Sequence, residues 1–284
     1  DCLLSRGLGD VYKRQPVAMR QNSEGVMANI AEARATSNIF IPQYINYKLK
    51  EIKKRLLSSQ KYKSFKYSFL HPKEIDSHPT TSALFIASRI GEVEELKKIL
   101  KIDNSLVNKI NILSGGKTPL YIATEEGHIN VIKILIKNGA DPKIKKEDDG
   151  NSILIIAVIS SSPSPIIVDF LIKEGVDVNY KNKRGNNALY MAVINGNLKI
   201  IDILLKNKSD PNQVRKIDSK TPLFMAAEKG DIKIVKKLLK YKADPNIATI
   251  NKHTPLCSAV ENGNNEIIHI LLDHKANTNI ITKF

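Results

Sequence analysis

Residues 118–142 read TPLYIATEEGHINVIKILIKNGADP, and nearly the same pattern returns twice further along the chain. Residues 221–245 read TPLFMAAEKGDIKIVKKLLKYKADP, and residues 254–278 read TPLCSAVENGNNEIIHILLDHKANT. Self-similarity at a fixed period is typical of a protein built from stacked copies of one structural unit. This repeat therefore decides the fold class before any single residue does.

The leucine of the TPL triplet marks the period. It recurs at Leu84, Leu120, Leu154, Leu189, Leu223 and Leu256, with spacings of 36, 34, 35, 34 and 33 residues. Thr118 is suited to cap a helix by accepting a backbone N–H, and Pro119 fits the first helical position. Gly127 can end that helix in the left-handed conformation, and the apolar residues after it predict a second helix.

The unit resembles the ankyrin repeat. The resemblance is carried by the capping Thr-Pro, a small residue three positions after the marker leucine, the closing glycine and the Ala-Asp-Pro turn. It implies an all-α ankyrin-repeat solenoid of about six helix-turn-helix units, joined by hairpin-like loops, over residues 80–284. Because only nine residues follow Lys275, we expect the last unit to be incomplete or uncapped and the chain to be a fragment.

Two departures from the family pattern stand out. The family prefers His after the marker leucine, where this chain has Phe85, Tyr121, Ile155, Tyr190, Phe224 and Cys257, so we predict a less rigid row of hairpin loops. The third unit has two extra residues within 160–165, which predicts a longer turn between its helices. That turn is either a neutral insertion or a partner contact.

The N-terminal part lacks the repeat. Residues 1–15 resemble translated sequencing-adapter read-through, and we treat them as a non-native artefact. Residues 16–79 form a separate basic segment in which Ile45, Leu49, Ile52 and Leu56 predict one amphipathic helix. This segment caps the first repeat, or docks through residues 44–69 to nucleic acid or an anionic membrane, or is disordered.

Composition bounds the remaining possibilities. The formal net charge of +15 suggests an anionic partner, although the abundance of Lys, Asn and Ile also fits an AT-rich genome. The longest apolar run, Ile153–Ile159, is too short to span a membrane, so we expect a soluble protein. Two cysteines make no disulfide framework, which favours a reducing compartment, and we expect the cytoplasm.

We find no set of residues for catalysis, a metal or a cofactor. The run of residues 115–118, GGKT, suggests a phosphate loop, but the first glycine that such a loop requires is replaced by Asn111. Cys257, at the family's His position, is expected to be a buried small residue, and His128 and His269 to have packing or surface roles. We therefore predict that the chain is not an enzyme.

The ankyrin resemblance places partner binding on the concave face, formed by the loop tips and the exposed side of the first helices. Carried over to this sequence, the expected partner-binding residues are Lys117, Glu125, Glu126, Asp148, Asp149, Asn151, Lys183, Arg184, Asn186, Ile194, Asn195, Asp218, Lys220, Glu228, Lys229, Asn251, His253, Glu261 and Asn262, with Arg89, Ile90, Ile159 and Ser160 at the same register positions. Acidic and basic residues are nearly balanced among them, which favours a protein partner over nucleic acid. Ile194 is the apolar contact that we single out.

Three hypotheses follow for function. The first is a monomeric, non-catalytic module that binds a partner protein of unknown identity. The second is docking to nucleic acid or an anionic membrane through residues 44–69. The third is the targeting part of a longer, truncated enzyme or secreted bacterial effector, which would place the protein in a host cytosol. The resemblance also suggests asparaginyl hydroxylation at Asn179, Asn212 and Asn246, although these residues also suit the loop geometry.

Overall fold

The computed structural model describes residues 79–110, 116–146 and 148–279. The expectations for residues 1–15 and for the basic helix within 44–69 lie outside these ranges. Within them the chain forms helices and no strand, which confirms the all-α prediction.

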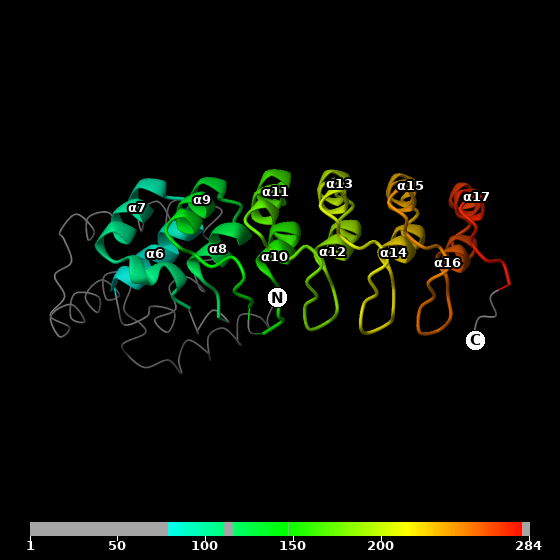
Figure 1. The fold of residues 1–284 in the computed structure, drawn as a ribbon, viewed down its shortest axis with the longest axis horizontal. Helices are drawn as coiled ribbons and strands as arrows, with labels where there is room; N and C mark the ends of the chain where they lie inside the picture. The colour runs from blue at the N-terminus through cyan, green and yellow to red at the C-terminus, as the bar shows by residue number, and fades with distance from the viewer. Residues whose placement is uncertain (1–78, 111–115, 147, 280–284) are drawn as a thin grey trace, which may run out of the picture.

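The helices alternate between two parallel rows (Figure 1). The first helices of the six units are α6 (Pro79–Ile90), α8 (Pro119–Glu125), α10 (Ile153–Ile159), α12 (Ala188–Ile194), α14 (Pro222–Glu228) and α16 (Pro255–Glu261). The second helices are α7 (Val93–Ile102), α9 (Ile129–Lys137), α11 (Pro165–Lys173), α13 (Leu198–Lys206), α15 (Ile232–Lys240) and α17 (Asn265–Asp273), with a short 3-10 helix, η3 (Asn104–Asn108), after α7. The loops that enter α12, α14 and α16 project beyond the first helices, on the side away from the second helices.

The first helices begin as the sequence predicts. The hydroxyl groups of Thr118, Thr221 and Thr254 accept hydrogen bonds from backbone nitrogens three residues later, at 3.1 to 3.3 Å. Ser152 and Asn187 take the same role in the third and fourth units, where the Thr-Pro pair is missing. Each such cap stabilises its helix by about 1 kcal/mol.

Small residues let neighbouring units stack closely. Ala123, Ala157, Ala192, Ala226 and Ala259 are all at most 1% exposed. The marker leucines are equally buried, except Leu256 of the last described unit, which is 8% exposed. On the second helices not every apolar residue lies in the core. Ile134, Ile136 and Ile203 are only half-buried, while Val131, Ile132 and Leu135 are fully buried.

Adjacent loops are linked through their backbones. Lys183 donates its backbone N–H to the carbonyl of Asp149 at 3.1 Å, and Ile250 donates to Asp218 at 3.0 Å. The lower rigidity that we predict for this loop row stays a prediction.

The third unit has the longer turn, since five residues separate α10 from α11. None of the helices in the described ranges is long and apolar enough to cross a membrane.

Candidate protein-binding face

The candidate site is the exposed side of the first helices together with the ends of the loops that lead into them, which we call the inner face. Two positions recur on it in every unit from the second to the sixth. One is the residue just before the helix cap, and the other is the last residue of the first helix, eight positions later.

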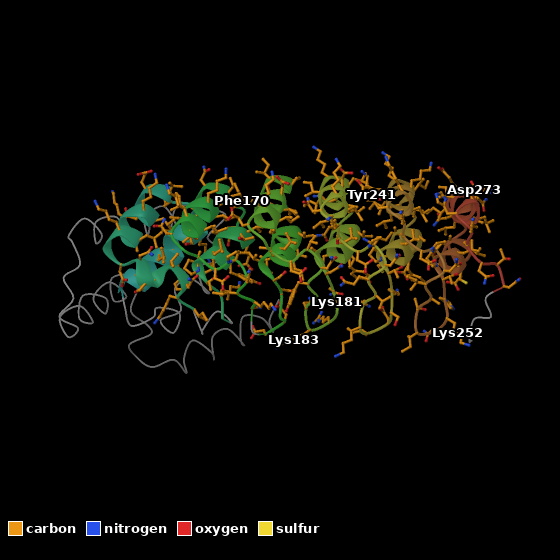
Figure 2. All side chains as sticks on the ribbon, viewed as in Figure 1. Phe170, Lys181, Lys183, Tyr241, Lys252 and Asp273 are labelled. Carbon is orange, nitrogen blue, oxygen red and sulfur yellow. The ribbon has the colours of Figure 1, made fainter. Side chains whose placement is uncertain are left out.

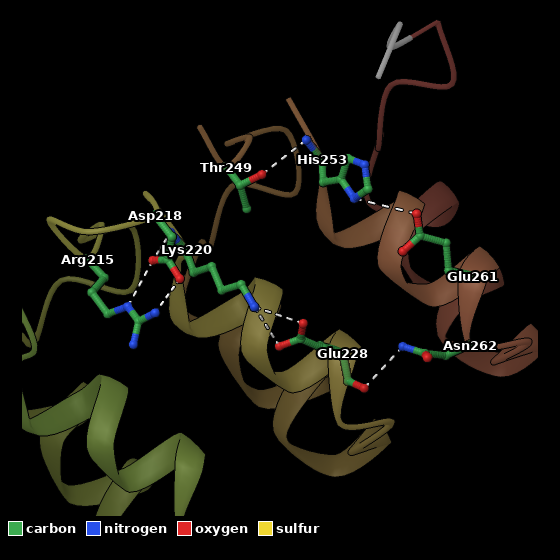
Figure 3. Close-up of polar contacts among 8 residues, drawn as sticks. All are labelled: Arg215, Asp218, Lys220, Glu228, Thr249, His253, Glu261 and Asn262. Carbon is green, nitrogen blue, oxygen red and sulfur yellow. Dashed lines mark hydrogen bonds and ion pairs between the residues drawn. The ribbon is translucent and has the colours of Figure 1, made fainter. Parts of the chain in front are cut away.

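In three units these two positions place a basic side chain beside a glutamate. Lys117 Nζ lies 2.8 Å from a carboxylate oxygen of Glu125, and Lys220 Nζ lies 2.8 Å from one of Glu228. In the sixth unit His253 Nδ1 lies 3.5 Å from Glu261, so this pair is ionic only when the imidazole is protonated (Figure 3). The charges that the sequence places on the inner face therefore largely neutralise each other within their own units.

The third and fourth units replace both members of the pair. Here Asn151 and Asn186 stand before the cap, and Ile159 and Ile194 end the helix. Both asparagines are buried, whereas Ile159 is 37% exposed and Ile194 is half-buried. We call these four residues the neutral window, since none of them is charged, whereas the same positions of the second and fifth units hold ion pairs.

The two window asparagines differ in how they are satisfied. Asn151 Oδ1 accepts a hydrogen bond from Asn182 Nδ2 at 2.7 Å. The carboxamide oxygen of Asn186 is buried and has no hydrogen-bond partner within the described part of the chain. A buried polar atom without a hydrogen-bond partner is uncommon and costs stability. The neutral window thus contains one polar atom whose hydrogen bonding is incomplete.

In the fourth, fifth and sixth units the residue after the first helix bonds a carbonyl of the preceding unit. Asn195 Nδ2 donates to the carbonyl of Val158 at 3.0 Å, and Asn262 Nδ2 donates to that of Glu228 at 3.2 Å. Lys229 donates to the carbonyl of Ile194 in the same way. Three expected partner contacts therefore serve, in this structure, as links between units.

The loops carry most of the remaining expected residues. In the loop before α10, Lys146 Nζ lies 3.4 Å from Asp148 and 3.7 Å from Asp149. In the loop before α14, Arg215 Nε donates to Asp218 Oδ1 at 2.8 Å. Burial tends to raise the pKa of Asp218, but hydrogen bonds from Arg215 and from the Lys220 backbone hold it below its usual value.

Sequence reasoning missed Lys146 and Arg215. Their spacing in the sequence could have identified them, because each lies three residues before an aspartate of its own loop. Of the other expected residues, Glu126 lies 4.0 Å from Arg89, while Arg184 and Asn251 are exposed at the loop tips.

Aromatic side chains replace the family's His beneath these charges. Lys117 and Lys220 lie over the rings of Tyr121 and Phe224, with Nζ 5.6 and 5.0 Å from the ring centroids. Burial raises the pKa of the Tyr190 hydroxyl to about 12, nearby Arg215 opposes that rise, and Asp218 and Glu228 add to it. In the second, fourth and fifth units the inner face thus rests on aromatic rings rather than on imidazoles.

The described residues contain no group of three His, Cys, Asp or Glu side chains that could hold a metal ion. Cys257 is half-buried, and its sulfur accepts a hydrogen bond from Thr254 Oγ1 at 3.3 Å. His128 Nε2 lies 2.8 Å from the carbonyl oxygen of Arg89, so it links two units as a packing residue would.

Comparisons with known proteins agree on the kind of protein. The family model described as "Ankyrin repeats (3 copies)" matches residues 50–146, 143–215 and 207–282. The solved ankyrin repeat domain of Bcl-3 has a TM-score of 0.64 to this structure and 22% sequence identity, and the match covers 70% of this chain and 89% of that one.

Curated relatives match over part of their length. An ankyrin repeat protein of Rickettsia felis is 27% identical over 129 residues, which are 45% of this chain and 41% of that protein. The human transient receptor potential cation channel subfamily A member 1 is 28% identical over 136 residues, 48% of this chain and 12% of the channel. Phosphocholine transferase AnkX of Legionella pneumophila is 29% identical over 126 residues, 44% of this chain and 13% of AnkX. The chain thus spans less than half the length of each of these relatives.

Proposed function

Since the chain belongs to the ankyrin repeat family, we propose that its inner face binds a partner protein and that the repeats carry out no reaction of their own. Ankyrin repeats are generally protein–protein interaction modules. In this proposal the chain recognises the partner, and any activity of the complex belongs to the partner.

The observation that carries the proposal is the neutral window. In the second, fifth and sixth units the residue before the cap and the last residue of the first helix are a basic side chain and a glutamate that contact each other. In the third and fourth units they are Ile159 and Ile194 beside buried asparagines, so this part of the face can gain from covering apolar surface. Desolvated apolar contacts surrounded by polar groups are typical of the energetic centre of a protein interface.

The charge pattern supports a protein rather than nucleic acid at this face. Binding to a phosphate backbone needs unneutralised cations. Lys117 and Lys220 instead lie 2.8 Å from carboxylates of their own units. The window itself carries no charge.

The test is capture of a protein from cell lysate by the full chain and by a window variant, Ile159→Ser with Ile194→Ser. The matched control is Ile166→Ser, which changes an isoleucine that is 67% exposed on the second helix α11. We expect the parent and the control to capture the same protein, and the window variant to bind it about tenfold more weakly or worse. Circular dichroism of all three proteins checks that the helices are retained.

Two outcomes would count against this function. One is that no protein is captured specifically by the parent. The other is that the window variant and the Ile166 control bind equally well, which would place the contact elsewhere on the chain.

A second candidate is favoured by the comparisons. A region similar to this chain makes up 13% of Legionella AnkX, which is named a phosphocholine transferase. In this second proposal the repeats are the recognition part of a longer bacterial enzyme that acts in a host cytosol. In the first proposal the protein acts in the cytoplasm of its own cell. Sequencing the complete reading frame distinguishes these cases, because a catalytic domain in the same frame is required by the second and not by the first.

A further inference from the structure

The tips of the last three loops form a second surface, separate from the neutral window. It comprises residues 181–184 before α12, 216–218 before α14 and 250–252 before α16, and we call it the tip edge. The loops hang side by side and end at nearly the same level (Figure 1). Lys181, Lys183 and Lys252 are labelled along this edge in Figure 2.

Two large apolar side chains stand exposed on the tip edge. Ile217 is 60% exposed and Ile250 is 70% exposed, at the same register position in consecutive loops. The backbone N–H of Ile250 donates to the carbonyl of Asp218 at 3.0 Å, which holds the two loops together just beside these isoleucines. Covering these two exposed side chains with an apolar surface would therefore be favourable.

Cations surround the two isoleucines. The exposed basic residues of the tip edge are Lys181, Lys183, Arg184, Lys216 and Lys252. Its single carboxylate, Asp218, is already hydrogen-bonded to Arg215 at 2.8 Å. The earlier loop before α10 differs, because there Lys146 lies close to both Asp148 and Asp149.

Hydrogen bonds hold the loops in register. Lys181 Nζ donates to the carbonyl of Val214 in the next loop at 3.3 Å, and Lys183 Nζ donates to that of Asp148 in the previous loop at 3.1 Å. The bond from Lys181 goes to a neutral carbonyl oxygen, so the positive charge of its ammonium group remains beside those of Arg184, Lys216 and Lys252. The edge therefore presents a row of positive charge around two apolar points.

We propose that the tip edge docks on an anionic lipid bilayer, with Ile217 and Ile250 inserted at the level of the headgroups and the cations against lipid phosphates. Apolar insertion together with electrostatic attraction to anionic lipids is how peripheral proteins hold an interface. A row of tips that ends at one level suits a flat surface, and the neutral window on the first helices stays available to a partner.

Nucleic acid fits this edge less well. A phosphate backbone would use the cations but would gain nothing from the two exposed isoleucines, and single strands need aromatic platforms. The nearest aromatic residue of these loops, Tyr180, is half-buried, and Lys145 covers its ring with Nζ 4.1 Å from the centroid.

The first test is fluorescence, because the chain contains no tryptophan. Ile250→Trp places one fluorophore on the tip edge of the full chain, and Ile166→Trp places one on α11 as the control. With vesicles of phosphatidylcholine and phosphatidylserine at 7:3, we expect emission from the Ile250→Trp protein to shift to shorter wavelength and to be quenched by brominated lipids. The Ile166→Trp protein should show neither effect.

The second test is co-sedimentation of the full chain with the same vesicles. Ile217→Ser with Ile250→Ser should weaken binding about tenfold or more, since two apolar insertions are lost while the charge is kept. Lys216→Gln with Lys252→Gln should weaken binding at low salt. Lys137→Gln with Lys233→Gln removes the same charge from the second helices and should leave binding near that of the parent.

Several results would overturn the proposal. Binding without a spectral shift at position 250 would mean that another segment, such as residues 44–69, holds the membrane. Equal loss from the tip and second-helix lysine pairs would mean attraction by net charge alone. Binding to a DNA duplex but not to vesicles, insensitive to the two isoleucines, would assign the edge to nucleic acid. Because the window variant leaves this edge intact, failure of either proposal leaves the other standing.

Discussion

Gly185 packs directly against the backbone of Lys216 in the next loop: a Cβ atom at position 185 would lie 2.7 Å from the Cβ of Lys216 and closer still to its backbone nitrogen. The backbone of Gly185 is also left-handed, with φ of +79°. Two requirements, conformation and space, thus meet in one residue at the junction between the fourth and fifth units.

Gly185→Ala should therefore be strongly destabilising. We expect a loss of about 2–5 kcal/mol in the free energy of unfolding, from left-handed backbone strain and from overpacking together. Gly175→Ala is the matched control, because Gly175 has φ of +80° with nothing within 4 Å of the added methyl group, and it should lose only about 1–2 kcal/mol. Urea denaturation compares the two, and equal losses would mean that the close approach to Lys216 relaxes freely.

This contact shows where prediction from the sequence ends. The caps at Thr118, Thr221 and Thr254 were predictable, because a helix cap depends on residues three positions apart in one segment. The approach of Gly185 to Lys216 depends on how one unit is rotated against the next, which the repeat pattern does not encode. For the same reason the sequence showed Lys229 as an exposed cation but not its bond to the Ile194 carbonyl.

The candidate site was predictable to a similar extent. The register placed Lys220 and Glu228 on the inner face, but not that Lys220 Nζ lies 2.8 Å from the Glu228 carboxylate. The repeat does contain a clue, since units with a glutamate at the end of the first helix also have Lys or His before the cap. Ile217 and Ile250 share a register position too, yet only the structure shows them 60% and 70% exposed.

Asparagine clamps join successive units at the foot of the second helices. Asn212 donates its side-chain amide to the carbonyl of Lys242 at 3.2 Å and accepts from the backbone nitrogen of Asp244 at 2.7 Å. The same pair of bonds is made by Asn108, Asn179 and Asn246. Lys143 holds this position between the second and third units, where its backbone nitrogen bonds Asp141 as that of Asn212 bonds Asp210.

Lys143→Asn should complete the missing clamp. We expect it to stabilise the chain by about 1 kcal/mol, because two exposed hydrogen bonds are added between units. Asn212→Lys, the reverse change one clamp along, should cost a similar amount. Thermal and urea unfolding measure both. A Lys143→Asn protein no more stable than the parent would show that the third unit, with its longer turn, does not bring its backbone within reach.

Left-handed lysines end three of the second helices. Lys208, Lys242 and Lys275 have φ of 65°, 64° and 65°, at the position that Gly139 and Gly175 occupy in earlier units. Lys242→Gly should stabilise the protein by about 0.5–1 kcal/mol. Glycine adopts the left-handed conformation without strain, and this gain exceeds the stability lost to the larger conformational entropy of glycine in the unfolded chain. Lys233→Gly, an exposed lysine within α15, should instead destabilise by about 0.5–1 kcal/mol. A loss of stability in both variants would contradict the strain argument.

The buried hydroxyl of Tyr190 makes stability depend on alkaline pH. The side chain is 2% exposed, and its oxygen has no hydrogen-bond partner in the described part of the chain. Burial is the main cause that raises its pKa to about 12, against about 10 in the unfolded chain. Below pH 9 both states keep the proton and this group adds no pH dependence. Between the two pKa values the unfolded state releases the proton while the folded state retains it, so stability falls as pH rises.

Tyr190→Phe should remove that loss. At pH 7 we expect the variant to be at least as stable as the parent, because an unsatisfied buried hydroxyl is replaced by a ring of the same shape. At pH 11 its advantage should grow by about 1 kcal/mol, which is the stability that ionisation of the unfolded tyrosine takes from the parent. Urea denaturation of both proteins at pH 7 and pH 11 measures this difference, and the comparison cancels the effect of the many lysines that lose charge in the same range. An advantage that stays the same at both pH values would show that Tyr190 releases its proton as readily in the folded chain as in the unfolded one, and that the hydroxyl is reached by water.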